Sequence, residues 1–448
     1  MDRYLIKNIH IVNEGKTIAG DLLIESGRIA KIGGTIDANA TEIDGTGKHL
    51  LPGVIDDQVH FREPGLTHKA TIATESRAAV AGGVTSFMEM PNTIPNALTQ
   101  ELLEDKYAIG AANSLANYSF FMGVSNDNAD EVLKTNDKRK DVCGIKIFMG
   151  SSTGNMLVDN YLTLDRLFRE SEVLIATHCE DEKIIKENYA RIKGEKEDLE
   201  PADHPRIRDE EACFSSSFTA VQFAKKYNSR LHILHISTAR ELQLFTNMIP
   251  LTDKRITTEV CVHHLSFTAD DYARLGYQIK CNPAIKASFN RDALWEALLD
   301  DRLDVIATDH APHTWAEKQP PYEKAHSGLP LVQHSLPLML HARAEGKISL
   351  ETIARKMSHA VADCFQIEGR GYIREGYKAD LVIVDTEATT TISRENLLYK
   401  CGWSPLEGQT LKGAVSQTFV NGRLIFENGY GKMTVHDSYR GERLSFSR

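Results

Sequence analysis

The sequence lacks the features that mark secreted, membrane-spanning and nucleic-acid-binding proteins. The opening residues, MDRYLIKNIHIVNEGK, contain no apolar signal core, and no stretch reaches the roughly 18 apolar residues that a membrane helix needs. The formal net charge is −10, with no basic stripe to attract a polyanion. We therefore expect a cytoplasmic protein that contacts neither membrane nor nucleic acid.

Cysteine is also scarce and scattered. The seven cysteines never form a CxxC pair, and their number is odd, which argues against a disulfide framework and against a thiolate zinc site. Apolar and charged residues, at 42% and 25%, are present in amounts typical of a soluble protein with a large core. The 448 residues suffice for a barrel of roughly 250 residues and a further unit.

The middle of the chain alternates short apolar strands with helical stretches. Such alternation predicts βαβ units, and eight strands predict a closed (β/α)8 (TIM) barrel of the α/β class. Helical periodicity is clearest in Thr71–Ala81, Glu211–Tyr227 and Arg291–Asp300. The expected strands are Gly53–His60, Val84–Met90, Tyr118–Val124, Gly144–Met149, Val173–His178, Arg230–Ile236, Thr257–His263 and Val305–Asp309.

Both ends of the chain are rich in strand patterns instead. Because these patterns flank the barrel region, we expect the two ends to build one small β-sandwich together. The domain limits are then 1–52 and 371–448 for the sandwich and 53–370 for the barrel. The expected strands are Tyr4–Val12, Asp21–Ile24, Arg28–Ile32, Ala379–Asp385 and Ser416–Val420, the last followed by a hairpin turn at Asn421-Gly422.

Residue types that bind metals fall at the ends of the predicted barrel strands. The carboxyl ends of barrel strands meet at one rim, where the active sites of this fold lie. Neutral imidazoles and a carboxylate at that rim suit zinc. The residues are His60 on strand one, Lys146 on strand four, His178 and His235 at the ends of strands five and six, and Asp309 at the end of strand eight.

Lys146 is the unusual member, because an unpaired ammonium in the apolar run GIKIFMG is costly. Two interpretations are open. The amine either reaches solvent or pairs with Asp309, or it has reacted with carbon dioxide and become an anionic carbamate that bridges two metals. The histidines that surround it favour the bridge.

Strand one carries a second indication. In DDQVHFR, strand alternation places Gln58, His60 and Arg62 on one face. Arginine presents a rigid fork suited to a carboxylate. A metal site beside Arg62 therefore predicts an anionic substrate with a carboxylate group.

The same alternation applies to the histidines of strand six. His232 stands three residues before His235, so in a regular strand the two side chains face opposite ways. We therefore expect His232 to pack outside the barrel, away from the metal ligands.

Motifs along most of the chain resemble those of the amidohydrolase superfamily, and within it the dihydroorotase family. The segments PNT, ATDHAPH and KCGWSPLEG are the most specific to that family and to near relatives such as allantoinases. The fold alone is shared by many chemistries. The matching segments are LPGVIDDQVHFREPG (51–65), AGGVTSFMEMPNT (81–93), GIKIFMGSSTGN (144–155), ATHCED (176–181), LHILHIST (231–238), TTEVCVHHL (257–265), CNPAIK (281–286), ATDHAPH (307–313) and KCGWSPLEG (400–408).

The resemblance implies a zinc enzyme with one or two ions per chain and a role for each matching residue. Asp309 would bind the first metal and carry the proton. The implied metal ligands are His60, carboxylated Lys146, His178, His235 and Asp309. The implied substrate contacts are Arg62, Asn92, Asn282, His313 and the backbone around Gly328.

The implied reaction is the reversible cyclisation of N-carbamoyl-L-aspartate to L-dihydroorotate and water, a step of de novo pyrimidine (UMP) synthesis. The expected partner is thus a small molecule, and the resemblance implies a homodimer. Two other functions stay open: another cyclic-amide hydrolase, of the allantoinase or hydantoinase type, or a catalytically inactive scaffold subunit. Arg62, Asn92 and His313 favour the first reaction, because hydantoins and dihydrouracil lack a carboxylate.

Strand one departs from the family pattern at Gln58. Dihydroorotases usually carry His-x-His there, and this sequence has Gln58-Val59-His60. An amide oxygen is a weaker zinc donor than imidazole. Three arrangements are open: Gln58 ligates through its oxygen, a water replaces it, or the first metal binds weakly and the enzyme is mononuclear. Gln58 is also the feature that favours an inactive scaffold.

Overall fold

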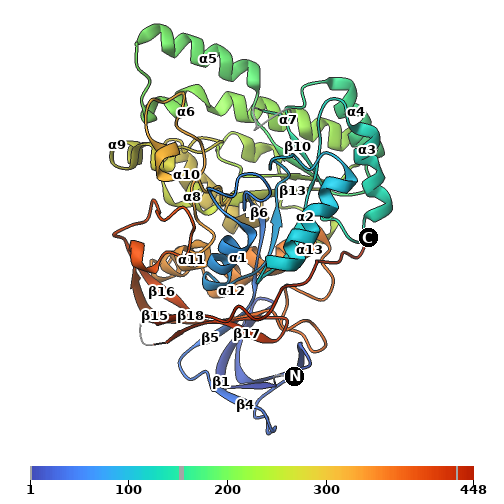
Figure 1. The fold of residues 1–448 in the computed structure, drawn as a ribbon, viewed down its shortest axis with the longest axis vertical. Coiled ribbons are helices and arrows are strands. Elements are labelled where there is room, and N and C mark those ends of the chain that lie inside the picture. The colour runs from blue at the N-terminus through green and yellow to red at the C-terminus, as the bar shows by residue number, and fades with distance from the viewer. Residues whose placement is uncertain (1–2, 151–155, 430–431) are drawn as a thin grey trace.

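The computed structural model describes residues 3–150, 156–429 and 432–448. A barrel with helices around it stands on a β-rich domain that contains the N-terminus, while the C-terminus lies beside the barrel (Figure 1). The predicted fold class, a (β/α)8 barrel with a β-sandwich domain built from both ends of the chain, is confirmed. The last five residues of the GIKIFMGSSTGN segment lie outside the described residues.

Parallel strands in chain order form the barrel wall, and within the described residues they match the eight that the sequence predicts. Strand three is interrupted at Phe121, so it is divided into β8 and β9. The strands are β6 (Val54–Val59), β7 (Val84–Glu89), β8 (Asn117–Phe120), β9 (Met122–Gly123), β10 (Ile145–Phe148), β11 (Ile175–His178), β12 (Leu231–Ile233), β13 (Ile256–Cys261) and β14 (Val305–Ala307).

The barrel closes where β6 meets the segment after β14. Val59 and His310 form a parallel bridge, and the backbone N–H of His60 donates to the carbonyl of His310 at 2.7 Å. At the other end of β6, the N–H of Gly53 donates to the carbonyl of Asp380 at 2.8 Å. This strand is therefore held at both ends, by the barrel rim and by the β-rich domain.

Helices surround the barrel, and their ends follow local sequence signals. Thr71 caps α1 by accepting from the N–H of Thr74, and Asp209 caps α7 by accepting from the N–H of Ala212. The three helices read from periodicity are confirmed as α1, α7 and α10. The α-helices are α1 (Ile72–Ala81), α2 (Gln100–Asn113), α3 (Ala129–Leu133), α4 (Tyr161–Glu170), α5 (Glu182–Glu195), α6 (His204–Ile207), α7 (Glu210–Tyr227), α8 (Val262–Ser266), α9 (Tyr272–Leu275), α10 (Ser288–Leu299), α11 (Ser335–Ala344), α12 (Leu350–Ala354) and α13 (Ala360–Phe365).

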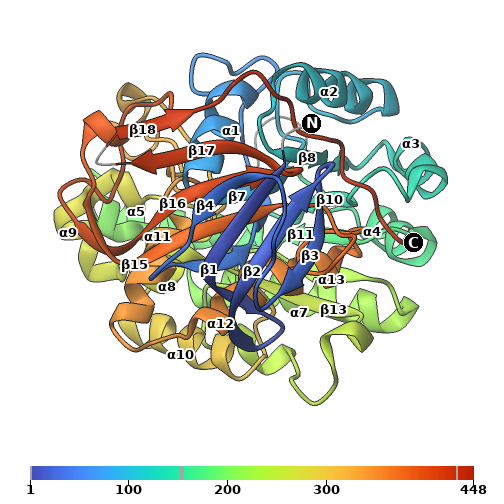
Figure 2. The same ribbon diagram turned by 90° about the horizontal axis from the view of Figure 1, so that it is seen from below.

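The β-rich domain is one continuous sheet of nine strands among the described residues, with strands from both chain ends side by side (Figure 2). Leu51 of β5 pairs with Val382 of β15, which joins the two halves. The predicted turn is present, because Asn421 and Gly422 both have positive φ, as a two-residue hairpin requires. The strands are β1 (Tyr4–Asn13), β2 (Lys16–Glu25), β3 (Arg28–Gly33), β4 (Thr41–Asp44), β5 (His49–Pro52), β15 (Leu381–Thr391), β16 (Thr410–Val420), β17 (Arg423–Gly429) and β18 (Lys432–Val435).

The prediction for His232 is wrong. In the barrel wall, Ala176 pairs with both Lys146 and His232, so these side chains lie in one row on the inner face. The His232 side chain is fully buried there and packs edge-on against the Phe365 ring at 5.3 Å. Alternation fails because β12 ends at Ile233 and His235 adopts a φ of 40°. Both histidines of this segment therefore face inward.

A separate apolar cluster fills the base of the barrel. The inward side chains of Ile55 and Met88 pack there against Phe365 of α13 and against Leu444 and Phe446 of the final segment. This final segment runs from the β-rich domain back along the barrel (Figure 1), where the N–H of Leu444 donates to the carbonyl of Tyr118.

All seven cysteines are free, in agreement with the sequence analysis. Within the described residues, no helix has both the length and the apolar character required to cross a membrane.

Replacing Phe446 by alanine should destabilise the protein by about 3–5 kcal/mol, the usual cost of emptying a buried phenylalanine site. The side chain is fully buried, whereas that of Ser445 beside it is exposed. Urea denaturation of Phe446→Ala measures the loss. Ser445→Ala is the control and should change stability by less than about 0.5 kcal/mol. Equal stability of the two variants would contradict a packing role for the tail.

Candidate metal centre and substrate pocket

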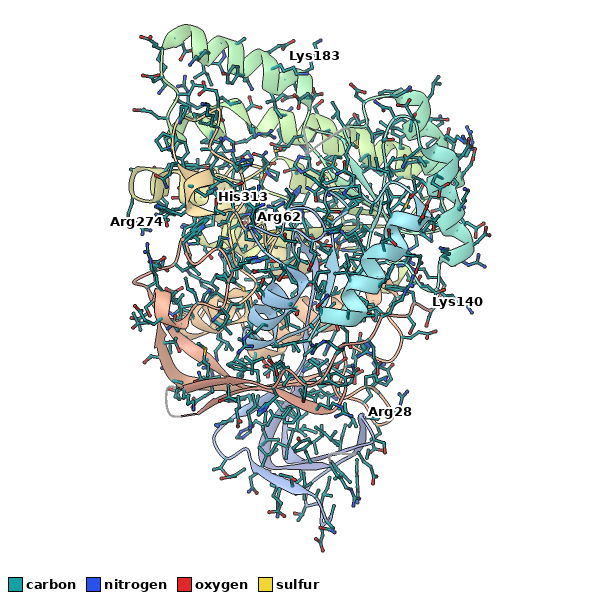
Figure 3. All side chains as sticks on the ribbon, in the orientation of Figure 1. Arg28, Arg62, Lys140, Lys183, Arg274 and His313 are labelled. Carbon is teal, nitrogen blue, oxygen red and sulfur yellow. The ribbon has the colours of Figure 1, made fainter. Side chains whose placement is uncertain are left out.

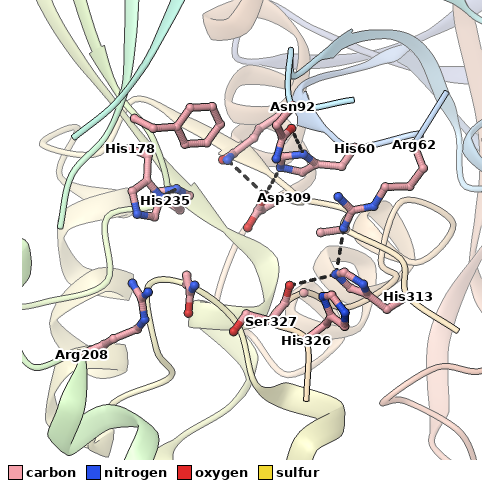
Figure 4. Close-up of a pocket in the computed structure, with 15 residues that line it drawn as sticks. His60, Arg62, Asn92, His178, Arg208, His235, Asp309, His313, His326 and Ser327 are labelled. Carbon is pink, nitrogen blue, oxygen red and sulfur yellow. Dashed lines mark hydrogen bonds and ion pairs between the residues drawn. The ribbon is translucent and has the colours of Figure 1, made fainter. Parts of the chain in front are cut away.

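A cavity of about 280 Å³ opens at the carboxyl ends of the barrel strands. All the site residues predicted from the sequence line it, except Lys146 (Figure 4). Of the five residues selected because they lie on barrel strands at the rim, four therefore converge on the cavity: His60, His178, His235 and Asp309. The cavity also has wall residues that the sequence analysis did not select: Phe148, Arg208, Ala311, His326 and Ser327.

One wall of the cavity is built around Asp309. Its Oδ1 lies 3.0 Å from His60 Nε2 and accepts a hydrogen bond from Gln58 Nε2 at 3.1 Å. On its other side, His60 Nδ1 lies 2.8 Å from Asn92 Oδ1. Burial acts to raise the pKa of Asp309, but the hydrogen bond and charge of His60 hold that pKa below its usual value. The carboxylate is therefore ionised at neutral pH.

The opposite wall carries a pair of histidines. His178 Nδ1 lies 3.0 Å from His235 Nε2, and His178 Nε2 lies 3.0 Å from Glu180 Oε2. Burial lowers the pKa of both histidines, that of His235 well below its ordinary value. Neutral imidazoles are the form that binds metals.

Lys146 lies beneath the cavity and does not pair with Asp309. Its side chain is 1% exposed, and Nζ has no hydrogen-bond partner within the described residues. The amine lies 4.6 Å from the centre of the Phe148 ring. Burial lowers the pKa of Lys146 to about 7. A neutral amine with a free lone pair is a nucleophile, so Lys146 is chemically suited to react with carbon dioxide.

The donor set of this region fits a metal. With a proton on Nε2, His60 donates to Asp309. With its proton on Nδ1 instead, donated to Asn92 Oδ1, His60 Nε2 and Asp309 Oδ1 are two acceptors 3.0 Å apart, and a cation between them would stabilise this tautomer. His235 Nδ1 and Lys146 Nζ are buried without partners, which is costly unless something binds them.

Basic groups form the end of the cavity that lies away from His178 and His235 (Figure 4). Arg62 Nη2 lies 3.0 Å from His313 Nε2, and the two side chains are adjacent in Figures 3 and 4. Lys69 donates to His313 Nδ1 at 3.1 Å, and Arg62 Nε donates to the carbonyl of Pro312. Arg62 adopts a φ of 67°, so its direction depends on a strained backbone rather than on strand alternation alone. This cationic end suits an anionic ligand group.

The third wall is a loop that Lys318 holds in place. Its buried Nζ donates to the carbonyls of Lys280, His326 and Gly328, at 2.8 Å for the last two. Gly328 has a φ of 131°, and a Cβ there would lie 2.6 Å from the carbonyl oxygen of Ala311. Position 328 thus needs glycine for space and conformation. On the same side, the Oδ1 of Asn282 lies 3.1 Å from His204 Nε2.

Arg208 is the main wall residue that sequence reasoning missed. It pairs with fully buried Glu180 and presents its guanidinium on the side of the cavity away from Arg62 (Figure 4). Burial acts to raise the pKa of Glu180, but Arg208 and His178 lower it to about 2. Arg208 lies in the loop between α6 and α7, far from any strand end. A search for metal-binding residues at strand ends therefore could not select it.

Comparison with known proteins identifies the family and the fold. Residues 49–425 match the profile of the amidohydrolase family. A dihydroorotase of Halobacterium salinarum is 34% identical over 91% of this chain and 96% of its own. An allantoinase of Desulfitobacterium hafniense is 30% identical over 95% of each chain. The solved L-hydantoinase (dihydropyrimidinase) of Arthrobacter aurescens superimposes with a TM-score of 0.92 at 26% identity, over 99% of this chain and 100% of its own.

Carbamate formation at Lys146 should be visible directly. A neutral amine and carbon dioxide give a carbamate and a proton, so the product should be lost as pH falls below about 7, where the amine becomes protonated. The measurement is ¹³C NMR of the protein in ¹³C-bicarbonate. Lys146→Met should abolish the signal, and exposed Lys140→Met should retain it. A signal that survives in Lys146→Met would disprove this assignment.

Proposed function

This chain belongs to the amidohydrolase family and is a cyclic-amide hydrolase, and we propose that its substrates are L-dihydroorotate and N-carbamoyl-L-aspartate. The enzyme would interconvert them by opening and closing the ring, as a step of pyrimidine synthesis. A dihydroorotase is among the relatives that match nearly the whole chain.

The observation that carries this proposal is the two-ended cavity. Histidines and Asp309 line one end, and Arg62 and His313 line the other. The Arg62 fork suits a carboxylate on the substrate ring. Burial lowers the pKa of Arg62 to about 10, so the guanidinium still carries its charge at neutral pH. Asn92 can add a donor, because its Oδ1 faces His60 and its amide nitrogen is available.

The residues present would hold one or two zinc ions. His60 and Asp309 would bind the first, His178 and His235 the second, and carboxylated Lys146 would bridge them. When bound, zinc lowers the pKa of water so that hydroxide forms near neutral pH, and it polarises the ring carbonyl.

Asp309 is the group that moves the proton. Its Oδ1 is occupied by His60 and Gln58, while no hydrogen bond between described residues engages Oδ2. Oδ2 would accept the proton released by the attacking water and deliver it to the leaving ring nitrogen. In the direction of ring closure, Oδ2 takes the proton from the carbamoyl nitrogen.

Gln58 takes a position that many relatives are expected to fill with histidine. In this structure it donates from Nε2 to Asp309, and its Oε1 lies 3.9 Å from Cys261 Sγ. We propose that Gln58 orients Asp309. The side-chain amide of Gln58 would have to flip for its Oε1 to ligate the first ion.

A second candidate is an allantoinase-type activity, which the 30% identical allantoinase of D. hafniense favours. Allantoin has no carboxylate to pair with Arg62. Substrate preference therefore separates the two candidates.

We expect the zinc-loaded protein to hydrolyse L-dihydroorotate in preference to allantoin, hydantoin and dihydrouracil, because only the first carries a ring carboxylate for Arg62. The measurement is kcat/KM for each compound under the same conditions. Preferential turnover of allantoin would replace the first candidate by the second, and no turnover of any compound would favour an inactive scaffold.

Replacing Arg62 by glutamine should lower kcat/KM for L-dihydroorotate roughly 10- to 100-fold, since a hydrogen bond between charged partners contributes about 1.5–3 kcal/mol. Arg62→Lys should recover part of this loss, because it restores the charge but not the fork. The exposed Arg274→Gln is the control. Unchanged kinetics in Arg62→Gln would remove Arg62 from substrate binding.

A further inference from the structure

A second group of metal-binding side chains lies inside the barrel and outside the cavity wall. Asp57 of β6, His232 of β12 and Glu259 of β13 are each fully buried. Each offers one ligand atom, and these atoms lie within 4.8 Å of one another. None of the three lines the cavity that contains the proposed catalytic residues.

The three side chains face one another at contact distance. His232 Nε2 lies 3.0 Å from Asp57 Oδ2 and 4.0 Å from Glu259 Oε2. Neither contact has hydrogen-bond geometry, and both oxygens of Asp57 and Oε2 of Glu259 are buried without a partner in the described structure. Unpaired buried carboxylate oxygens are costly, so this arrangement needs a further group.

The hydrogen bonding of Thr257 indicates which atom of His232 is free. The Thr257 hydroxyl lies 2.8 Å from His232 Nδ1 and donates to the carbonyl of Leu231 at 3.4 Å. A hydroxyl has a single proton, so when that proton goes to Leu231 the hydroxyl accepts from Nδ1–H. The lone pair of Nε2 then faces Asp57 and Glu259. In this tautomer the ring presents Nε2 as an acceptor to the two carboxyl groups.

No lysine or arginine of the described chain forms an ion pair with this group. Among described residues, His232 alone provides a basic nitrogen within 4.0 Å of the carboxylates of Asp57 and Glu259. Neighbouring Asp56 is a contrast, because its carboxylate accepts from the hydroxyl of Thr308 at 2.7 Å.

We propose that Asp57, His232 and Glu259 bind a divalent cation of the zinc class inside the barrel, separately from the ions of the cavity. Ligand atoms on a tetrahedral zinc stand about 3.3 Å apart when bonds are about 2.0 Å. The observed separations of 3.0 and 4.0 Å require only small side-chain movements to meet that value. Thr257 then holds the imidazole ring as metal-bound histidines usually require.

This ion would join three strands and support His235. It would tie β6 to the paired strands β12 and β13, neither of which is a neighbour of β6 in the sheets. Glu259 uses its other oxygen, Oε1, to accept from the backbone N–H of His235 at 2.9 Å. Because His235 has a positive φ, fixing Glu259 helps to fix a backbone that is strained. The ion is thus a structural one beneath the reactive site.

Two measurements on the full-length protein test this proposal. The first is the anomalous difference map of zinc-loaded wild-type crystals at the zinc edge. We expect a peak bounded by Asp57, His232 and Glu259, apart from any peak beside His178 and His235. Absence of density at the interior position would overturn the proposal, and this measurement needs no variant that folds.

The second measurement is zinc per chain after dialysis. Asp57→Asn should retain about one equivalent less than wild type, because it removes an anionic ligand at constant size. Asp56→Asn is the matched control, since Asp56 is an equally buried neighbour outside the group, and it should retain the wild-type content. Lys146→Met should keep the interior ion while weakening binding in the cavity. Equal zinc content in Asp57→Asn and wild type would exclude the interior site.

Discussion

The closure of the barrel at β6 is the constraint on which the rest of the structure depends. Hydrogen bonds from Gly53 to Asp380 and from His60 to His310 hold this strand at both ends. The second of these bonds brings the end of β6 against the segment after β14. His60 and Asp309 therefore meet although 249 positions separate them. Because β5 leads directly into β6 and pairs with β15, the β-rich domain anchors the same strand.

Burial gives the assembled residues their chemistry. Desolvation keeps the imidazoles of His178 and His235 neutral and brings the pKa of Lys146 to about 7. The same environment makes every unpaired acceptor costly, and when the proton of His60 lies on Nδ1, two acceptors face one another at His60 and Asp309. Such opposition is tolerable where a cation stands between the acceptors. The interior group of Asp57, His232 and Glu259 also brings buried, unpaired ligand atoms together.

Much of the architecture was predictable because it follows from local periodicity. Strand and helix patterns located all barrel strands to within a few residues, and the Asn421-Gly422 turn followed from its dipeptide. The strand-end rule also selected His178, His235 and Asp309, since parallel strands of a barrel share one rim. It failed at His232, where a positive φ at His235 interrupts alternation. It did not predict Arg208, which reaches the cavity from a loop between helices.

The sequence by itself determined the order of strands and helices, the ligand types at the rim, and the departure at Gln58, because these depend on side-chain chemistry and short-range geometry. Only the tertiary structure decided that Gln58 donates to Asp309, that Lys146 is left without a partner, and that Glu180 holds Arg208 at the cavity. These are contacts between segments far apart in the chain. Their energies depend on burial and on distances of a few ångströms, which appear only once the barrel has closed.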